Sequence, residues 1–318
     1  MVRRQPKVAF SPANGLGDKL LDTVGFHVLC KHADLGPILR FNERAARAEW
    51  GDNVYDTRLF DFGNSIELGA NDEDYRLESP DPSISLCPYN VYVILSRLDP
   101  QRVTFEGVSD SFAESAKAIV RPADDISRRL PRGLETAHGI HMRRSDKVRQ
   151  GGCDPRHEND VAEFRTVVSA LLEDVYALIL REERPAFFVV SEDARWRSEV
   201  EARIRVLAEM AGKTITFARP DYRGVAAFDS VLDMFGLARC ADIRQGVKYS
   251  SFSTAAALVG NVRLINYAHL LERGDECLIH NWTSVLSING GPRELDPDVH
   301  RRSAASRCGP VSITKRIA

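Results

Sequence analysis

Residues 139–148, GIHMRRSDKV, gather an imidazole, two guanidiniums, a hydroxyl, a carboxylate and an ammonium within a few positions. The apolar residues that open this segment predict a short buried strand, which ends in a charged turn. Two adjacent arginines at a strand end are costly to place unless an anion meets them. Phosphate suits them because guanidinium is a planar fork of donors that matches phosphate oxygens. A surface salt-bridge cluster is the commoner explanation of an isolated Arg-Arg pair, and a second matching segment downstream is what favours the phosphate site.

The second segment is YSSFST at residues 249–254, which precedes an alanine-rich helix at 255–259. Hydroxyl residues before a helix usually serve as caps. The same geometry also directs several backbone amides and the positive helix end at a common point, which is a ready anion site. The amino end of this predicted helix, taken with Arg143 and Arg144, therefore predicts a pyrophosphate site that needs no metal.

A third loop contains Gly15, Gly17 and Asp18, between a predicted strand at 7–11 and a predicted helix at 19–31. It is not a GxGxxG fingerprint, because Leu20 stands where the third glycine would be, and it lacks the GxxxxGK of a Walker loop. A tight turn is one explanation. The other is that the two glycines let the backbone approach a bound substrate closely.

Strands alternate with helices through the second half of the chain, which predicts an α/β protein with a parallel sheet covered on both faces. The predicted strands are 139–142, 186–190, 214–217, 241–245 and 263–265, and the predicted helices are 160–181, 199–210, 230–240 and 253–259. The three loops above then follow carboxyl ends of strands, where open α/β sheets bind ligands.

The first half is less regular, with a polar stretch at 51–88, an apolar segment at 89–98 and a helix-like pattern at 109–120. Prolines 122 and 131 punctuate a predicted linker. We therefore expect an N-terminal domain at 1–130, a C-terminal nucleotide-binding domain at 131–291 and a partly disordered tail at 292–318.

Composition excludes several classes of protein. The 318 residues are 43% hydrophobic and carry a net charge of −2, so no basic field favours nucleic acid or an anionic membrane. The cysteines are scattered without a CxxC pair, which argues against a zinc site or disulfide framework and favours a reducing compartment, here expected to be the cytoplasm. No stretch approaches the ~18 apolar residues of a membrane span. No DxD pair stands at a predicted strand end, so we expect no metal site.

These segments together resemble the fucosyltransferase superfamily. HxRRxD at 141–146, DMxxLARCA at 233–241 and SSxS at 250–253 follow the order of the family, and NGLGDKL at 14–20 resembles its first glycine loop. The α1,6-fucosyltransferases, including rhizobial nodulation-factor enzymes, are most similar in pattern, and protein O-fucosyltransferases are more distant. The resemblance implies a GT-B fold: two Rossmann-like domains facing a central cleft, with GDP-fucose held by the C-terminal domain.

The resemblance also implies roles for individual residues. His141 would contact the guanosine part of the donor, and Arg143 and Arg144 would bind the diphosphate and offset charge as GDP departs. Asp233 would accept hydrogen bonds from the guanine edge, although a solvated helix residue would have the same sequence context. Ser250 and Ser251 would hold phosphate oxygens. No cofactor is implied beyond the donor substrate, and the partner is a glycan or glycoconjugate acceptor.

The general base departs from the family pattern. Relatives place a glutamate five residues after the motif aspartate, and that position is Gly151 here. The longer loop offers Asp154 and Glu158, of which we favour Asp154 as the catalytic base, and Asp18 is another candidate. The acceptor and linkage stay open for the same reason. Alternatives are a transferase for another nucleotide-sugar, a dinucleotide oxidoreductase, which the missing third glycine disfavours, and a catalytically silent sugar-nucleotide-binding protein.

Overall fold

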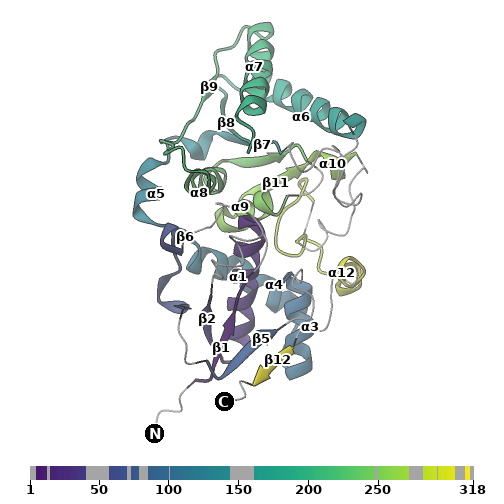
Figure 1. The fold of residues 1–318 in the computed structure, drawn as a ribbon. Coiled ribbons are helices and arrows are strands. Elements are labelled where there is room, and N and C mark those ends of the chain that lie inside the picture. Colours follow the sequence, from purple (N-terminus) through teal and green to yellow (C-terminus); the bar gives the residue numbers. More distant parts are fainter. Residues whose placement is uncertain are drawn as a thin grey trace. The chain divides into compact units, whose positions relative to one another are not determined.

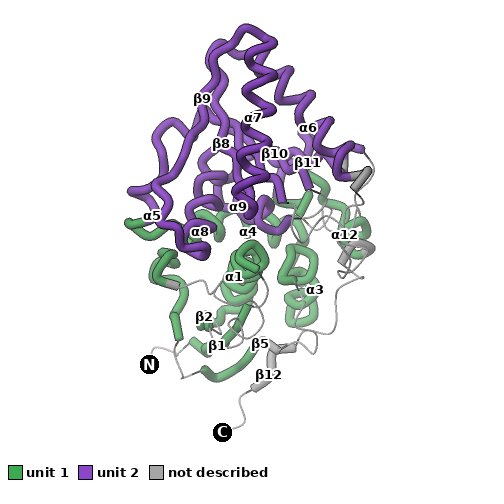
Figure 2. Tube along the Cα trace, turned by 45° about the horizontal axis from the view of Figure 1, so that its top comes forward, with its two compact units in different colours: residues 1–125, 280–285, 293–318 green, residues 126–279, 286–292 purple. Residues whose placement is uncertain are grey.

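The computed structural model describes residues 5–12, 15–40, 57–69, 73–78, 85–99, 101–143, 161–247, 250–271, 282–291, 293–304 and 312–315. The chain divides into two compact units (Figure 2). Unit 1 comprises residues 1–125, 280–285 and 293–318, and unit 2 comprises residues 126–279 and 286–292. The division after residue 125 lies five residues before the domain boundary expected after residue 130, and the segment predicted as a tail contributes elements to unit 1.

Unit 2 is built on a five-stranded sheet in which all strands are parallel (Figure 1). The strands are β7 (His138–His141), β8 (Ala186–Val190), β9 (Thr216–Phe217), β10 (Asp242–Gln245) and β11 (Arg263–Asn266). Their order is β11-β10-β7-β8-β9, so the chain winds outward in one direction from β7 and then in the other from β10. The switch point between β7 and β10 is where the crevice of an open α/β sheet forms.

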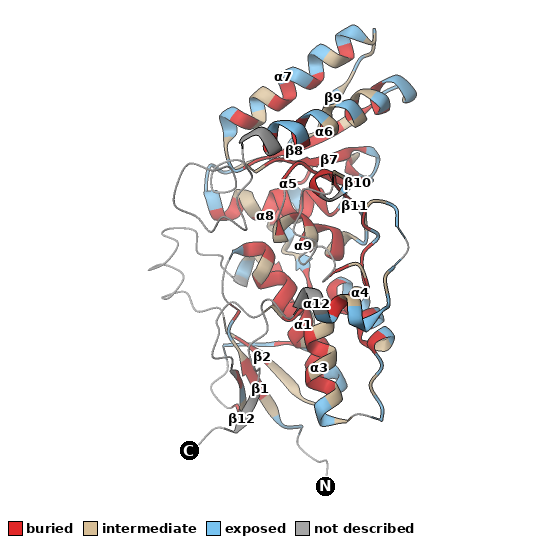
Figure 3. Cartoon of the chain, turned by 90° about the vertical axis from the view of Figure 1, so that its right-hand side faces the viewer, coloured by how far each residue is buried: buried red, intermediate tan, exposed pale blue. Residues whose placement is uncertain are grey.

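Helices connect these strands. They are α6 (Val161–Arg181), α7 (Ala194–Met210), α8 (Ala226–Leu237) and α9 (Ser251–Gly260), with short α5 (Asp124–Arg129), η3 (Leu134–Thr136) and α10 (Tyr267–Leu270). Phe187 and Val189 of β8 join the apolar cluster formed with α6 and α7. The intervening Phe188 contacts α8 on the other face. Strands that are buried on both faces explain the continuous apolar runs of the sequence (Figure 3).

Two glycines let α8 and α9 pack closely. A Cβ on Gly236 of α8 would lie 2.4 Å from the Phe188 ring, and a Cβ on Gly260 of α9 would lie 1.9 Å from the Ala238 carbonyl oxygen. Both distances are far below van der Waals contact. Glycine at these positions therefore allows α8 to pack closely on the sheet and the end of α9 to pack closely on the end of α8.

Unit 1 has a second five-stranded sheet, in the order β12-β5-β1-β2-β4. Its strands are β1 (Lys7–Phe10), β2 (Gly36–Leu39), β4 (Glu67–Leu68), β5 (Tyr75–Glu78) and β12 (Ser312–Lys315). The last pairs antiparallel with β5, and the others are parallel. A separate antiparallel pair joins β3 (Phe60–Asp61) to β6 (Arg121–Pro122).

The helices of unit 1 are α1 (Leu16–His32), α3 (Pro88–Leu98), α4 (Phe105–Ile119) and α12 (Pro297–Ala304), with short η1 (Thr57–Leu59) and η2 (Gly63–Ser65). The buried carboxylate of Asp22 on α1 accepts a hydrogen bond from the Leu86 amide at 2.8 Å, which fixes the chain as it enters α3. The predicted α/β class with parallel sheets is confirmed by both units. No helix in the described part of the chain has the length and apolar character needed to cross a bilayer.

Candidate functional site

The switch point of unit 2 brings two buried polar side chains side by side. His141 ends β7, and Gln245, its register partner, ends β10. His141 is 4% exposed and Gln245 is 2% exposed. The Gly246 amide donates to the His141 carbonyl at 3.0 Å, so the two chains leave the sheet together. A site at this edge is therefore formed by the segments that follow β7 and β10.

His141 is a neutral hydrogen-bonding group in this site. Its Nδ1 lies 2.5 Å from the Ser253 hydroxyl of α9, and its ring lies 5.1 Å from the ring of Phe252. Burial and the nearby Arg143 guanidinium lower the pKa of His141 to about 3. A neutral imidazole has one donor and one acceptor, so His141 offers hydrogen bonds rather than charge.

Among the described residues, no side chain caps the amino end of α9 or offsets its positive partial charge. Ser250 occupies the N-cap position in an extended conformation, but its side chain makes no capping hydrogen bond, and no acidic residue lies in the first turn. Within the described part of the chain, its buried Oγ has no hydrogen-bond partner, as is also true of Gln245 Oε1. Buried serines in α4, such as Ser109, share this property. The combination of an uncapped helix end with polar atoms at a switch point is what indicates an anion site.

The structure brings several of the sequence-predicted residues together. Ser250 and Ser251 lie at the start of α9, the helix whose Ser253 contacts His141. Arg143 follows β7 by two residues and lies close enough to affect the pKa of His141. Arg144 and Asp154, like Glu158, lie outside the described residues.

The glycine loop belongs to unit 1. Gly15 is the N-cap of α1 with φ −71°, and a Cβ built on it would meet nothing within 4 Å. Neither its backbone conformation nor its packing therefore requires glycine. Gly17 is buried in the first turn of α1, and Asp18 is half-buried beside it.

Asp233 is not a solvated helix residue, which was one of the two interpretations left open by the sequence. It is 8% exposed on α8, and the Tyr222 hydroxyl donates to its Oδ1 at 2.5 Å. Burial raises the pKa of Asp233 to about 7, while Tyr222 and Arg197 lower it. The Arg197 guanidinium lies 5.1 Å from the centroid of the Tyr222 ring and donates to its hydroxyl at 3.2 Å. A buried carboxyl with so altered a pKa is a candidate functional group.

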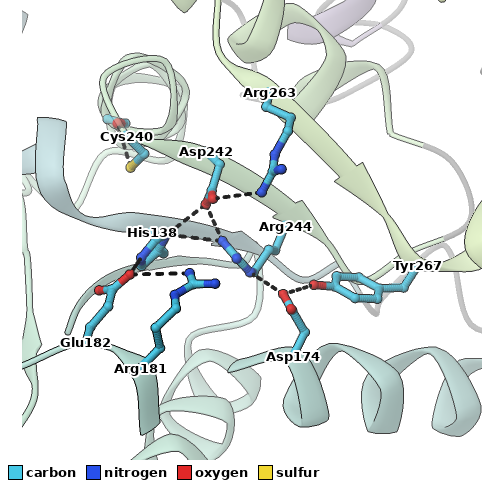
Figure 4. A network of polar contacts seen from close by, with 10 residues as sticks. His138, Asp174, Arg181, Glu182, Cys240, Asp242, Arg244, Arg263 and Tyr267 are labelled. Carbon is cyan, nitrogen blue, oxygen red and sulfur yellow. Dashed lines mark hydrogen bonds and ion pairs between the residues drawn. The ribbon is translucent and has the colours of Figure 1, made fainter. Parts of the chain in front are cut away.

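A second polar cluster was not predicted from the sequence (Figure 4). Arg244, in β10, is 2% exposed; its Nε donates to Asp174 at 2.8 Å, and its Nη1 pairs with Asp242. The hydroxyl of Tyr267 donates to the same Asp174 oxygen at 2.6 Å. These contacts join α6 to β10 and to the end of β11, which is a structural function.

His138 extends this cluster to the amino edge of the sheet. Its Nδ1 lies 2.9 Å from Asp242 and its Nε2 lies 2.8 Å from Glu182. Burial alone would lower the pKa of His138, but hydrogen bonds with these two carboxylates raise it overall. No motif could have revealed the cluster, since its members are spread from residue 138 to residue 267.

No group of three or more His, Cys, Asp or Glu side chains that could hold a metal ion occurs among the described residues. Among the described residues, Arg143 and the α9 helix end place positive charge near the switch point. This arrangement can hold an anion by hydrogen bonds and fixed charge.

No protein-family model and no curated protein matches the chain. Among solved structures, a NodZ α-1,6-fucosyltransferase soaked with GDP-fucose matches with a TM-score of 0.52 at 12% identity, over 86% of this chain and 97% of that chain. The chain has a fucosyltransferase-like fold. NodZ from Bradyrhizobium also matches with a TM-score of 0.48 at 12% identity, over 84% and 96% of the two chains. Arabidopsis thaliana FUT1 in complex with GDP matches with 0.45 at 12% identity, over 82% and 70%.

Proposed function

We propose that this protein is a glycosyltransferase that moves fucose from GDP-fucose to a hydroxyl of a glycan or glycoconjugate acceptor. The observation that carries the proposal is the switch point of unit 2, where neutral His141 contacts Ser253 of α9, the amino end of α9 has no side-chain cap, and Arg143 follows β7. The fucosyltransferase-like fold supports it, because the similar NodZ structure was soaked with GDP-fucose. In this proposal unit 2 binds the donor and unit 1 binds the acceptor, across a GT-B cleft.

Each group has a part in holding the donor. The diphosphate lies at the end of α9, where Ser250 and Ser251 contribute hydroxyls and the helix amides contribute donors. Arg143 and Arg144 supply the fixed positive charge, and His141 donates to or accepts from the guanosine part. Asp233 accepts the N–H groups of the guanine edge. Gly15 and Gly17 leave room for the substrate near the start of α1, which agrees with the open space around Gly15.

The reaction exchanges one bond for another at the anomeric carbon. The acceptor oxygen bonds to this carbon while the bond to the diphosphate oxygen breaks, and both electrons of that bond leave with GDP. Arginines and the helix end stabilise the charge that develops, because they are already oriented in the ground state. The proton of the acceptor hydroxyl passes to a carboxylate, for which Asp154 is our candidate, as a general base. No metal takes part in the proposed reaction, and we place the enzyme in the cytoplasm.

Thermal unfolding with GDP, UDP, ADP and NAD tests the proposal. A ligand that binds only the folded state at ~100 times its dissociation constant stabilises by about 2.7 kcal/mol, which is readily measured. We expect stabilisation by GDP and none by UDP, ADP or NAD. An equal response to UDP would contradict the guanine assignment, and stabilisation by NAD alone would favour an oxidoreductase. Release of fucose or its transfer product from GDP-fucose separates a transferase from a silent binding protein.

A further inference from the structure

Side chains from two other segments of unit 2 are linked to Asp233 by polar contacts. Asp233 comes from α8, Tyr222 from the segment after β9, and Arg197 from α7. The three side chains form a chain of contacts in which the arginine holds the tyrosine and the tyrosine donates to the carboxyl. Three separate segments of unit 2 therefore converge on one buried acid.

We propose that Tyr222, held by Arg197, is a positioning residue that fixes the Asp233 carboxylate to accept from the N1–H and N2–H groups of guanine. This inference rests on the proposed GDP-sugar function. It assigns base recognition to a set of three residues rather than to the aspartate alone. Tyr222 itself need not touch the nucleotide.

Asp233 accepts one hydrogen bond within the described residues, which leaves lone pairs on its carboxylate oxygens unused. A carboxylate has about four lone-pair sites on its two oxygens. The hydroxyl of Tyr222 uses one site on Oδ1, and it is the one hydrogen-bond donor to Asp233 within the described residues. The remaining sites suit the parallel N1–H and N2–H donors of guanine. Adenine presents no such pair of donors, so the arrangement selects guanine.

The charges around Asp233 make the hydrogen bond from Tyr222 important for keeping this carboxyl ionised. Burial favours the neutral form of Asp233, and Asp229 in the same helix adds to this effect, whereas Tyr222 and Arg197 favour the ionised form. Arg219, which pairs with Glu201, also acts on Tyr222. Because the pKa of Asp233 is about 7, loss of one donor shifts the carboxyl toward its neutral form at physiological pH. A neutral carboxyl is a poorer acceptor for two N–H groups.

The test measures binding of GDP, IDP and pyrophosphate by calorimetry at pH 7 and pH 9. We expect Tyr222→Phe to weaken GDP binding about tenfold at pH 7, because more of Asp233 is then neutral, and to weaken it less at pH 9, where the carboxyl is ionised again. IDP lacks the N2 amino group, so the preference for GDP over IDP should fall. Pyrophosphate, which has no base, should bind as it does to the wild type.

Two further variants keep the test decisive. Arg197→Gln should act in the same direction with a smaller effect, about threefold, because it loosens Tyr222 without removing its hydroxyl. Arg197→Gln also serves as the test variant if Tyr222→Phe does not fold. Tyr176→Phe on α6 is the matched control, since the Tyr176 hydroxyl makes no polar contact with the described residues. It should bind GDP normally.

The outcomes separate the inference from the function. If Tyr222→Phe binds GDP as the control does, or equally loses pyrophosphate, Tyr222 does not position Asp233. Tighter binding of GDP would also overturn the inference, because it would mean that Tyr222 competes with the base. In each of these cases wild-type binding of GDP leaves the proposed function standing. Failure of the wild type itself to bind GDP would overturn both.

Discussion

Replacing Arg244 by methionine should destabilise unit 2 more than any exposed charge substitution. Methionine has a similar length but carries no charge or donor. The guanidinium of Arg244 lies among Asp242, Asp174 and His138 and is almost fully buried. Its removal leaves the Asp242 carboxylate, whose side chain is 10% exposed, without its main counter-charge.

The size of the effect follows from that burial. Removal of one partner of a buried ion pair costs about 3–5 kcal/mol, because the remaining charge stays desolvated. The loss should depend on pH through His138. Its folded pKa is raised, so its charge stabilises the folded state at low pH and this contribution disappears as pH rises through the folded pKa. At pH 5.5 the protonated imidazole partly replaces the guanidinium, so the larger loss is expected at pH 8.5.

Urea unfolding of Arg244→Met at both pH values measures these losses. The double variant Arg244→Met with Asp242→Asn should recover a large part of the loss at pH 8.5, since it removes the uncompensated charge. The control is Arg102→Met, which breaks an exposed pair with Asp99 and should change the free energy of unfolding by less than about 0.5 kcal/mol. If Arg244→Met behaved like this control at both pH values, the buried cluster would not stabilise the fold.

Three other predictions concern the proposed reaction. Arg144→Lys should lower transfer about tenfold or more in a GDP-release assay, because lysine keeps the charge but loses the bidentate fork; near-normal turnover would place Arg144 outside the phosphate site. Activity should survive EDTA, and its abolition by chelation with recovery in Mn²⁺ would require a metal-based mechanism. Asp233→Asn should abolish GDP binding yet stabilise the protein at pH 8. The folded pKa of about 7 exceeds the unfolded value, so ionisation of Asp233 costs stability as pH rises between them. A lower melting temperature of this variant at pH 8 would contradict the reasoning.

The elements of unit 2 could be predicted closely from the sequence. Residues 186–190 form β8 as predicted, and the helix expected at 160–181 is α6, Val161–Arg181. The reason is physical: strands buried on both faces need uninterrupted apolar residues, and the helices that cover them need apolar residues at helical spacing. Each pattern is local, so these strands and helices can be predicted without knowing which other elements they pack against.

Unit 1 was less predictable because pairing, rather than local composition, defines its strands. β4 is two exposed residues, Glu67 and Leu68, which become a strand through their register with β2. β12 lies in a segment expected to be a tail and pairs with β5, over two hundred residues earlier. α5 occupies the predicted linker. A local sequence pattern does not reveal which distant segment a strand pairs with.

The same limit applies to the candidate site. His141 was identified because it ends a strand, which is a local property, but its contact with Ser253 spans 112 residues. The sequence left Asp233 either solvated or functional, and its burial became clear from the packing of Tyr222 and Arg197 around α8. Arg244 gave no signal, because a charged residue in a strand is as consistent with an exposed strand as with a buried ion pair.

The two ends of the unit 2 sheet differ in how their polar groups are satisfied. Toward the amino edge, both ring nitrogens of His138 contact carboxylates, and Asp242 pairs with His138 and Arg244. At the carboxyl edge, Ser250 Oγ and Gln245 Oε1 are buried and have no hydrogen-bond partner among the described residues, and none of these residues caps the end of α9 with its side chain. A buried polar atom without a hydrogen-bond partner lowers the stability of the fold by about 1–3 kcal/mol. Folding alone gives no reason to keep such atoms. A bound anion with hydroxyl and N–H groups would meet these atoms. Ser109 in α4 also lacks a partner in the described part of the chain, so what favours a ligand is the coincidence of such atoms with the uncapped end of α9 at the carboxyl edge.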